Sequence, residues 1–126
     1  MLFAVALAVS AFTVIDGDTL KDASGQRIRL LAIDAPEMGK CPKRRVCAPG
    51  DPVASTASLR GLLRGAIEVQ AVGKDRYGRT LAVVRANGVN LSCEMLRLGH
   101  AIYKRDWDNG RRIFAECPQS TLVNKR

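Results

Sequence analysis

The segment that decides the fold is RIRLLAIDAPE, residues 27–37. Its apolar residues from 28 to 33 follow one another too closely for a strand with one wet face, so we expect a strand that is covered on both faces. Arg29 lies within this run, and because an isolated buried charge is costly, its guanidinium must be paired or directed at a ligand. Pro36 ends the strand, since it cannot donate to the hydrogen-bond ladder. The segment therefore predicts a buried strand with charged groups at each end.

The spacing of Arg29 and Asp34 conflicts with a regular strand. The two residues are five positions apart, so strict alternation would direct their side chains to opposite faces. Either a bulge intervenes, or Asp34 lies beyond the end of the strand. The Ala35-Pro36 step favours the second explanation.

Charge is unevenly distributed along the chain. Twenty lysine and arginine residues against twelve aspartate and glutamate residues give a net charge of +8, which predicts a polyanionic partner. Acidic residues gather in residues 16–37, whereas residues 40–65 are rich in lysine and arginine. An acidic group on a basic body is what a site for a cation and a phosphate requires. The alternative is that the lysines and arginines simply form a solvated face.

The remaining pattern predicts one α+β domain, mainly β, over residues 1–126. Turn signals separate five β-type runs, at residues 12–15, 19–21, 26–34, 67–72 and 80–84. Asp51-Pro52 is a helix start, and apolar spacing and end signals predict two more helices at residues 91–98 and 111–117. Five strands with two to three helices are typical of a five-stranded OB-fold barrel.

Three segments lack such periodicity. Residues 1–11 carry no charge and are too few for a membrane span of about 20 residues, so we expect either the remnant of an export signal or an extension of the first strand. We expect no stable membrane association. Residues 38–51 contain glycine, proline and basic residues and predict a long surface loop. Residues 118–126 predict a mobile tail.

Four cysteines allow three disulfide pairings. Cys41 and Cys47 are close enough in sequence for a local bridge, which we favour, and Cys93 with Cys117 is a possible second pair. A zinc site is disfavoured, because there is no CxxC and the one histidine, His100, is distant in sequence. Disulfides would place the protein in an oxidising compartment, secreted or periplasmic. The alternative is a cytosolic protein with four reduced cysteines.

Four carboxylates are candidates for a metal site. Asp16 and Asp18 share a strand parity, and a hairpin could bring them beside Asp34 and Glu37. Such a group needs a cation to offset its repulsion, and its oxygen-only chemistry suits calcium or magnesium. The Asp-Gly-Asp turn by itself is weak support, since these are common turn residues.

Two arginines favour a phosphate ligand. Arg29 and Arg79 each stand near the start of an apolar strand. Phosphodiester cleavage requires positive donors for the charge that develops on phosphate oxygens, and guanidinium forks match those oxygens. Taken singly, each arginine is explained better by a salt bridge to a nearby carboxylate, but the two arginines together with the acidic group make that the poorer explanation.

Three blocks now carry a resemblance: VIDGDT at residues 14–19, RLLAIDAPE at residues 29–37 and DRYGR at residues 75–79. In this order and spacing they resemble the signature blocks of the staphylococcal nuclease (thermonuclease) family, and the similarity runs from about residue 12 to residue 103. The resemblance implies an OB-fold enzyme that hydrolyses DNA and RNA with calcium and leaves 3′-phosphates. We expect the protein to be a monomer. The resemblance also implies a role for each site residue: Asp18, Asp34 and the Ala35 carbonyl as calcium ligands, Asp16 as support, Arg29 and Arg79 as phosphate ligands, Tyr77 as an orienting group, and Glu37 beside the attacking water as general base or water-positioning group.

Two further predictions concern additional nucleotide contacts and an alternative function. Tyr103 and Lys104 could contact a nucleotide together with Trp107, with core packing as the alternative for the two aromatic residues. A non-catalytic OB module that binds nucleic acid or protein is the alternative function. Such a module would not need the carboxylates and arginines together, and this sequence has them all.

Overall fold

A computed structural model describes residues 11–123 of the chain. It has a mixed α/β architecture with three α-helices, consistent with the fold of the family that the sequence resembles. The main sheet begins with an antiparallel meander of β1 (Thr13–Asp16), β2 (Thr19–Lys21) and β3 (Arg27–Leu30). Strand β3 then runs parallel to β6 (Thr80–Ala86), which pairs antiparallel with β5 (Ile67–Lys74) and with β7 (Val89–Asn90). Among the described residues β1 and β5 do not pair, so the sheet is open at these two edges.

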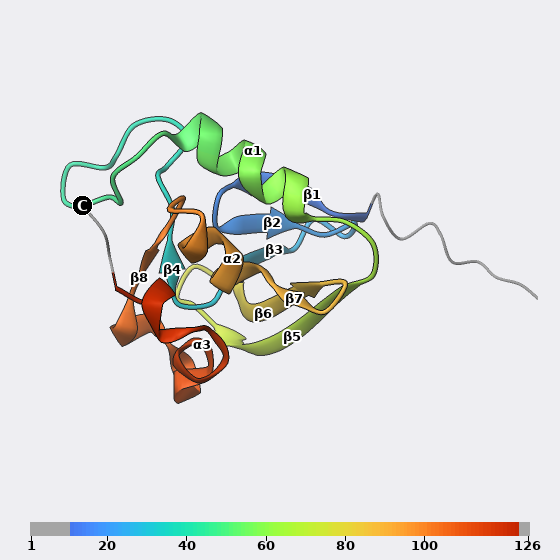
Figure 1. Ribbon diagram of the computed structural model, residues 1–126. Coiled ribbons are helices and arrows are strands. Elements are labelled where there is room, and N and C mark those ends of the chain that lie inside the picture. The colour runs from blue at the N-terminus through green and yellow to red at the C-terminus, as the bar shows by residue number, and fades with distance from the viewer. Residues whose placement is uncertain (1–10, 124–126) are drawn as a thin grey trace, which may run out of the picture.

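The helices begin where the sequence signals predict. Helix α1 (Pro52–Leu62) starts after Asp51, whose carboxylate accepts hydrogen bonds from the backbone N–H groups of Val53 and Ala54. Helix α2 (Leu91–Arg97) starts after Asn90, whose side chain accepts from the N–H of Cys93. Helix α1 lies along one side of the meander and α3 (Arg112–Glu116) lies on the opposite side of the molecule (Figure 1).

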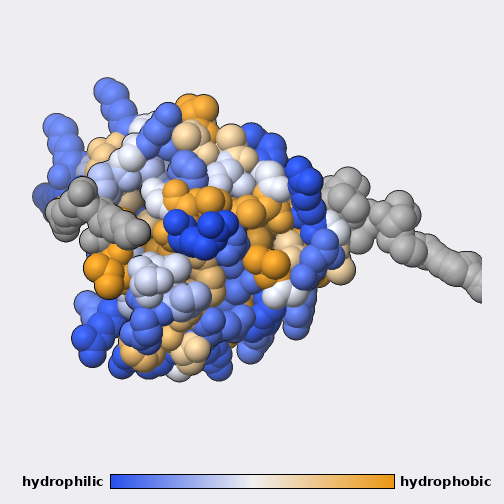
Figure 2. Space-filling model, in the orientation of Figure 1, coloured by the Kyte–Doolittle hydropathy of each residue, from blue (hydrophilic) through white to orange (hydrophobic). Residues whose placement is uncertain are grey.

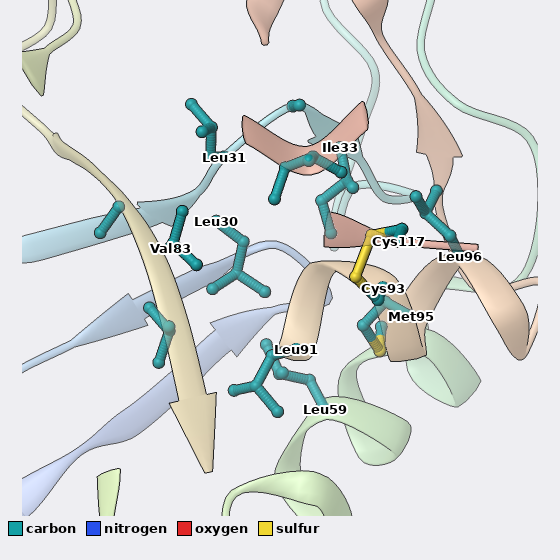
Figure 3. Packing of buried hydrophobic residues seen from close by; sticks show 14 of the residues in the cluster. Leu30, Leu31, Ile33, Leu59, Val83, Leu91, Cys93, Met95, Leu96 and Cys117 are labelled. Atoms are coloured by element: carbon teal, nitrogen blue, oxygen red, sulfur yellow. A yellow bond between two sulfur atoms is a disulfide. The ribbon is translucent and has the colours of Figure 1, made fainter. Parts of the chain in front are cut away.

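The core fills the space between the sheet and α1 and α2. Its largest fully buried side chains include Leu20, Leu59, Leu91, Met95 and Ile113. Figure 3 shows several core residues close together: Leu30, Leu31, Ile33, Leu59, Val83, Leu91 and Met95. Gly17 lets α1 approach the turn between β1 and β2, since a Cβ there would lie 1.9 Å from the Ser55 hydroxyl oxygen. This close packing fixes the turn that carries Asp16 and Asp18.

Both predicted disulfides are confirmed. The Cys93–Cys117 bond is buried in the core, where it joins α2 to the residue that follows α3 (Figure 3). The Cys41–Cys47 bond closes a small ring in the surface loop. Their sequence separations are 24 and 6. In the chain-entropy treatment such loops correspond to about 3.5 and about 2 kcal/mol of stabilisation, respectively. The buried bond is therefore the larger contributor to stability, and the exposed one mainly restrains its loop.

The predicted continuous strand over residues 26–34 is wrong. Strand β3 ends at Leu30, residues 31 and 32 form a turn in which Ala32 has a φ of 66°, and β4 (Ile33–Asp34) then pairs with β8 (Ile102–Tyr103) in a second sheet. Hydrophobicity does not mark the break, because the residues on both sides of it are buried. The turn changes the direction of the chain, and it resolves the spacing conflict between Arg29 and Asp34.

The last described segment, residues 118–123, packs against the domain, and residues 124–126 of the predicted tail lie outside the described residues. Residues 118–123, predicted to be mobile, include a 3-10 turn, η4 (Gln119–Thr121), and Leu122 packs against the core. Most of the predicted N-terminal signal remnant or strand extension lies outside the described residues. Within residues 11–123, no helix combines the length and apolar character needed to span a bilayer.

Candidate functional site

Asp18 connects the first hairpin to the end of β4. Its side chain is buried, and its Oδ2 accepts hydrogen bonds from the backbone N–H of Ala35 at 2.8 Å and from Nη2 of Arg29 at 3.2 Å. The Thr19 hydroxyl donates to Oδ1 at 2.8 Å. The backbone carbonyl of Asp18 also accepts from the N–H of Leu30 at 2.8 Å. The turn after β1 is therefore fixed against β3 and β4.

Arg29 holds two buried carboxylates together. Its Nη2 donates to Asp18 at 3.2 Å and to Oδ1 of Asp34 at 3.3 Å, and its Nη1 donates to the carbonyl of Ile33 at 2.9 Å. The guanidinium carbon lies 5.0 Å from the centre of the Trp107 ring, within range of a cation–π contact. Arg29 is 6% exposed and Asp34 is 1% exposed, so these charges are shielded from water. The salt bridge that the sequence offered as an alternative for Arg29 thus exists, and it involves both predicted calcium ligands.

Glu37 is linked to the same group through Arg45. Nη1 of Arg45 donates to Oε1 of Glu37 at 2.5 Å, and Nη2 donates to Oδ1 of Asp34 at 2.9 Å. Sequence reasoning missed Arg45. The basic composition of the loop pointed to a functional segment, but no periodicity distinguishes Arg45 from Lys43 or Arg44.

A pocket of about 730 Å³ adjoins these residues. Among the residues that line it are Arg29, Arg45, Tyr77, Arg79 and Trp107. Nε of Arg79 donates to Asp75 at 2.6 Å, and its guanidinium lies 5.3 Å from the centre of the Tyr77 ring, which is 71% exposed. Four arginines, Arg76 included, and two aromatic residues thus line one cavity beside buried carboxylates, an arrangement suited to a phosphate with an attached base.

The family model described as "Staphylococcal nuclease homologue" matches residues 27–116. The chain belongs to the staphylococcal nuclease family. The thermonuclease of Staphylococcus intermedius is 42% identical over 90% of this chain and 70% of that protein. The succinoglycan biosynthesis protein ExoI of Rhizobium meliloti is 32% identical over 89% of this chain, which spans only 59% of that protein.

Two of the substrate-binding residues predicted for this chain, Tyr103 and Lys104, lie in different surroundings. The Tyr103 hydroxyl donates to Oδ2 of Asp108 at 2.6 Å, and Tyr103 lines a separate pocket of about 550 Å³. Burial and this hydrogen bond raise the pKa of Tyr103 to about 12. Nζ of Lys104 lies 5.1 Å from the centre of the Trp107 ring, whose other cationic neighbour is Arg29. Lys104 thus neighbours the main pocket through Trp107 and Tyr103 through Asp108, and neither is among the residues that line it.

The carboxylates have the chemistry, though not the ready arrangement, of a calcium site. Within residues 11–123, no three or more histidine, cysteine, aspartate or glutamate side chains are positioned together to hold a metal ion. Arg29 and Arg45 both contact Oδ1 of Asp34, and Arg29 also contacts Oδ2 of Asp18. Burial, followed by the neighbouring Asp18 carboxylate, raises the pKa of Asp16 to about 7, and burial also raises the pKa of Asp34. Oxygen donors that burial and repulsion disfavour as anions fit a hard cation.

The raised pKa of Asp16 predicts a pH dependence of stability. The pKa of Asp16 is about 7 in the folded state and 3.8 in the unfolded state, so between these pH values the folded protein holds a proton that the unfolded chain has released. The free energy of unfolding therefore falls as the pH rises from about 4 through 7. Relative to Asp16→Asn, the wild type should lose about 2 kcal/mol across this window, after a reduction for the partial solvent screening of Asp16. Urea unfolding of both proteins from pH 4 to 8 in a chelator measures it. Parallel curves would contradict the shift.

Proposed function

We propose that this protein is a calcium-dependent endonuclease that hydrolyses phosphodiester bonds in DNA and RNA and leaves 3′-phosphates. One observation carries the proposal: Arg29 and Arg79 line the same pocket, and Arg29 at the same time contacts the buried carboxylates of Asp18 and Asp34. A scissile phosphate in that pocket would meet guanidinium donors next to oxygen ligands for a cation. The similarity to a protein named thermonuclease supports the same activity.

The residues divide into two groups of roles. Asp18, Asp34 and the Ala35 carbonyl would hold calcium, with Asp16 as a nearby support. When bound, the ion would neutralise negative charge on the scissile phosphate and favour a reactive water. The remaining chemistry belongs to the protein.

Arg29 and Arg79 would donate to the phosphate oxygens, where negative charge grows as the new bond to phosphorus forms. Tyr77, already in contact with the Arg79 guanidinium, would orient the phosphate from the rim of the pocket. Glu37 would accept the proton of the attacking water or hold that water in line. The bond to the 5′ oxygen then breaks, so the phosphate stays on the 3′ oxygen.

A second candidate is an OB-type module that binds nucleic acid or protein without cleaving it. It is favoured by the arginine contacts that occupy the carboxylate oxygens of Asp34 and Glu37. Similarity to a protein named for succinoglycan biosynthesis also shows that relatives carry names other than nuclease.

Hydrolysis assays distinguish the two candidates. We expect purified protein with intact disulfides to degrade single-stranded DNA, duplex DNA or RNA in CaCl2, and to stop when EGTA is added in excess. Product ends should support primer extension only after phosphatase treatment, which identifies 3′-phosphates. If none of the three substrates is hydrolysed in calcium, magnesium or manganese, the binding module is the better interpretation.

We also propose the wider setting of the protein. Two disulfides indicate an oxidising compartment, and secretion or export to the periplasm would supply one. We propose a monomer that acts on DNA and RNA without stable membrane association. The family resemblance supports a single domain over residues 1–126 with a five-stranded OB-type barrel, whose closure would require pairing at the open edges of the described sheet.

A further inference from the structure

Arg45 is the one basic residue of the disulfide-closed ring that contacts the candidate metal ligands. The ring comprises residues 41–47, and in it the chain turns so that the N–H of Arg45 donates to the carbonyl of Pro42 at 3.0 Å. Lys43 and Arg44 lie at the tip of this turn and are exposed, whereas Arg45 is half-buried. Hydrophilic side chains project at the end of the molecule where this loop lies (Figures 1 and 2). The ring thus directs one guanidinium inwards.

Arg45 contacts two acidic residues that have different proposed roles in the reaction. Its Nη2 lies 2.9 Å from Oδ1 of Asp34, a proposed calcium ligand, and its Nη1 lies 2.5 Å from Oε1 of Glu37, the proposed base. Asp34 Oδ1 also accepts from Arg29 at 3.3 Å. The shorter contact is that of Arg45, so Arg45 is the stronger occupant of this oxygen.

A cation and this guanidinium compete for the Asp34 carboxylate, whose Oδ1 already accepts from both Arg45 and Arg29. A carboxylate oxygen that accepts from two guanidinium groups has little remaining capacity for a metal bond, and a divalent ion placed against Arg45 would be repelled by its charge. The restraint of the 41–47 ring adds to the competition, because a tethered cation has a higher local concentration than a free one.

We propose that Arg45 is an internal competitor for the divalent cation, a positioning residue whose contacts with Asp34 and Glu37 lower the calcium affinity of the site. The proposal rests on the proposed calcium site, and it assigns to the Cys41–Cys47 ring the role of holding the competitor in place. Calcium binding then requires the Arg45 side chain to leave Asp34.

Isothermal titration of CaCl2 into Arg45→Gln tests the proposal, with Arg44→Gln as the matched control. Both variants remove one positive charge from the same ring, but Arg44 makes no described contact with the site. At fixed ionic strength and without substrate, Arg45→Gln should bind calcium about tenfold more tightly than Arg44→Gln, a difference of about 1.4 kcal/mol. Arg44→Gln should stay within about twofold of the wild type because an exposed charge is screened.

A second variant tests the ring itself. Cys41→Ser with Cys47→Ser leaves Arg45 in place but removes its tether, so the calcium affinity should fall between those of the wild type and Arg45→Gln. Equal affinities for Arg45→Gln and Arg44→Gln, or weaker binding by Arg45→Gln, would overturn the proposal. If Arg45→Gln binds calcium more tightly while no substrate is hydrolysed, the competitor stands and the nuclease fails. If substrates are hydrolysed but the affinities do not differ, the nuclease stands and the competitor fails. No calcium binding by any of these proteins would overturn both.

Discussion

Replacing Arg29 with alanine is expected to lower the free energy of unfolding by about 3–5 kcal/mol, the range for a buried ion pair that loses one partner. The variant would leave Asp18 and Asp34 buried without their shared guanidinium, and the carbonyl of Ile33 would lose its donor. Arg45 remains on Asp34, but the structure shows no other cationic donor to Asp18 among the described residues. Urea unfolding at pH 7 in a chelator measures the loss. The same variant should lose nuclease activity, so activity needs to be measured under conditions where the protein is folded.

Arg85→Ala is the matched control. Arg85 also extends from a strand of the main sheet and also contacts two carboxylates, Glu68 and Glu116. Those carboxylates reach solvent, so their charges are not stranded when the arginine is removed, and the expected loss is at most about 1 kcal/mol.

Arg29→Lys separates charge from geometry. It keeps a positive charge near the two aspartates, but a single ammonium group cannot reproduce the guanidinium fork. Stability should recover in part, whereas the rate of hydrolysis should remain low. If Arg29→Ala costs no more than Arg85→Ala, the buried carboxylates do not depend on Arg29, and the arrangement described here is contradicted.

The sequence predicted those parts of the fold that depend on local signals. The Asp51-Pro52 start of α1 and the apolar spacing and end signals of α2 involve neighbouring residues, and the structure has the helices there. The break after Leu30 was missed because it requires Ala32 in a left-handed conformation, which alanine rarely adopts and which packing around residues 31–33 imposes. The short strands β7 and β8 were missed because strands of two residues have no periodicity.

The sequence singled out the residues of the candidate site, but it did not predict the contacts among them. Charge beside apolar strands needs an explanation, so Asp18, Asp34, Arg29 and Arg79 were candidates. In the structure Arg29 and Arg79 line one pocket, and Asp18 and Asp34 are buried against Arg29. Which groups pair is decided by the tertiary arrangement. Arg45 reaches Asp34 across 11 positions of irregular chain, a contact that no sequence spacing indicates.

Replacing Glu37 with glutamine is expected to lower kcat for hydrolysis by about 10²–10⁴-fold, the range for losing a general base. Glutamine has nearly the same shape and can still accept a hydrogen bond from Arg45, but it cannot take a proton from water. The Glu37 side chain is 29% exposed, so its pair with Arg45 should add less than about 1 kcal/mol to stability and the variant should remain folded. Initial rates on single-stranded DNA in saturating calcium, with unfolding curves of the same samples, measure both effects.

Glu94→Gln is the control for this last comparison. Glu94 also pairs with an arginine, Arg97, and its side chain is 23% exposed, but it lies on α2 away from the pocket. It should therefore have wild-type activity with a similarly small change in stability.

A Glu37→Gln rate within tenfold of the wild type would exclude Glu37 as the base. A large loss accompanied by an unchanged pH–rate profile would instead assign Glu37 to holding the water, because a residue that takes the proton must contribute its own ionisation to that profile. The pH–rate profile, rather than the size of the loss alone, thus distinguishes the two roles that the position of Glu37 permits.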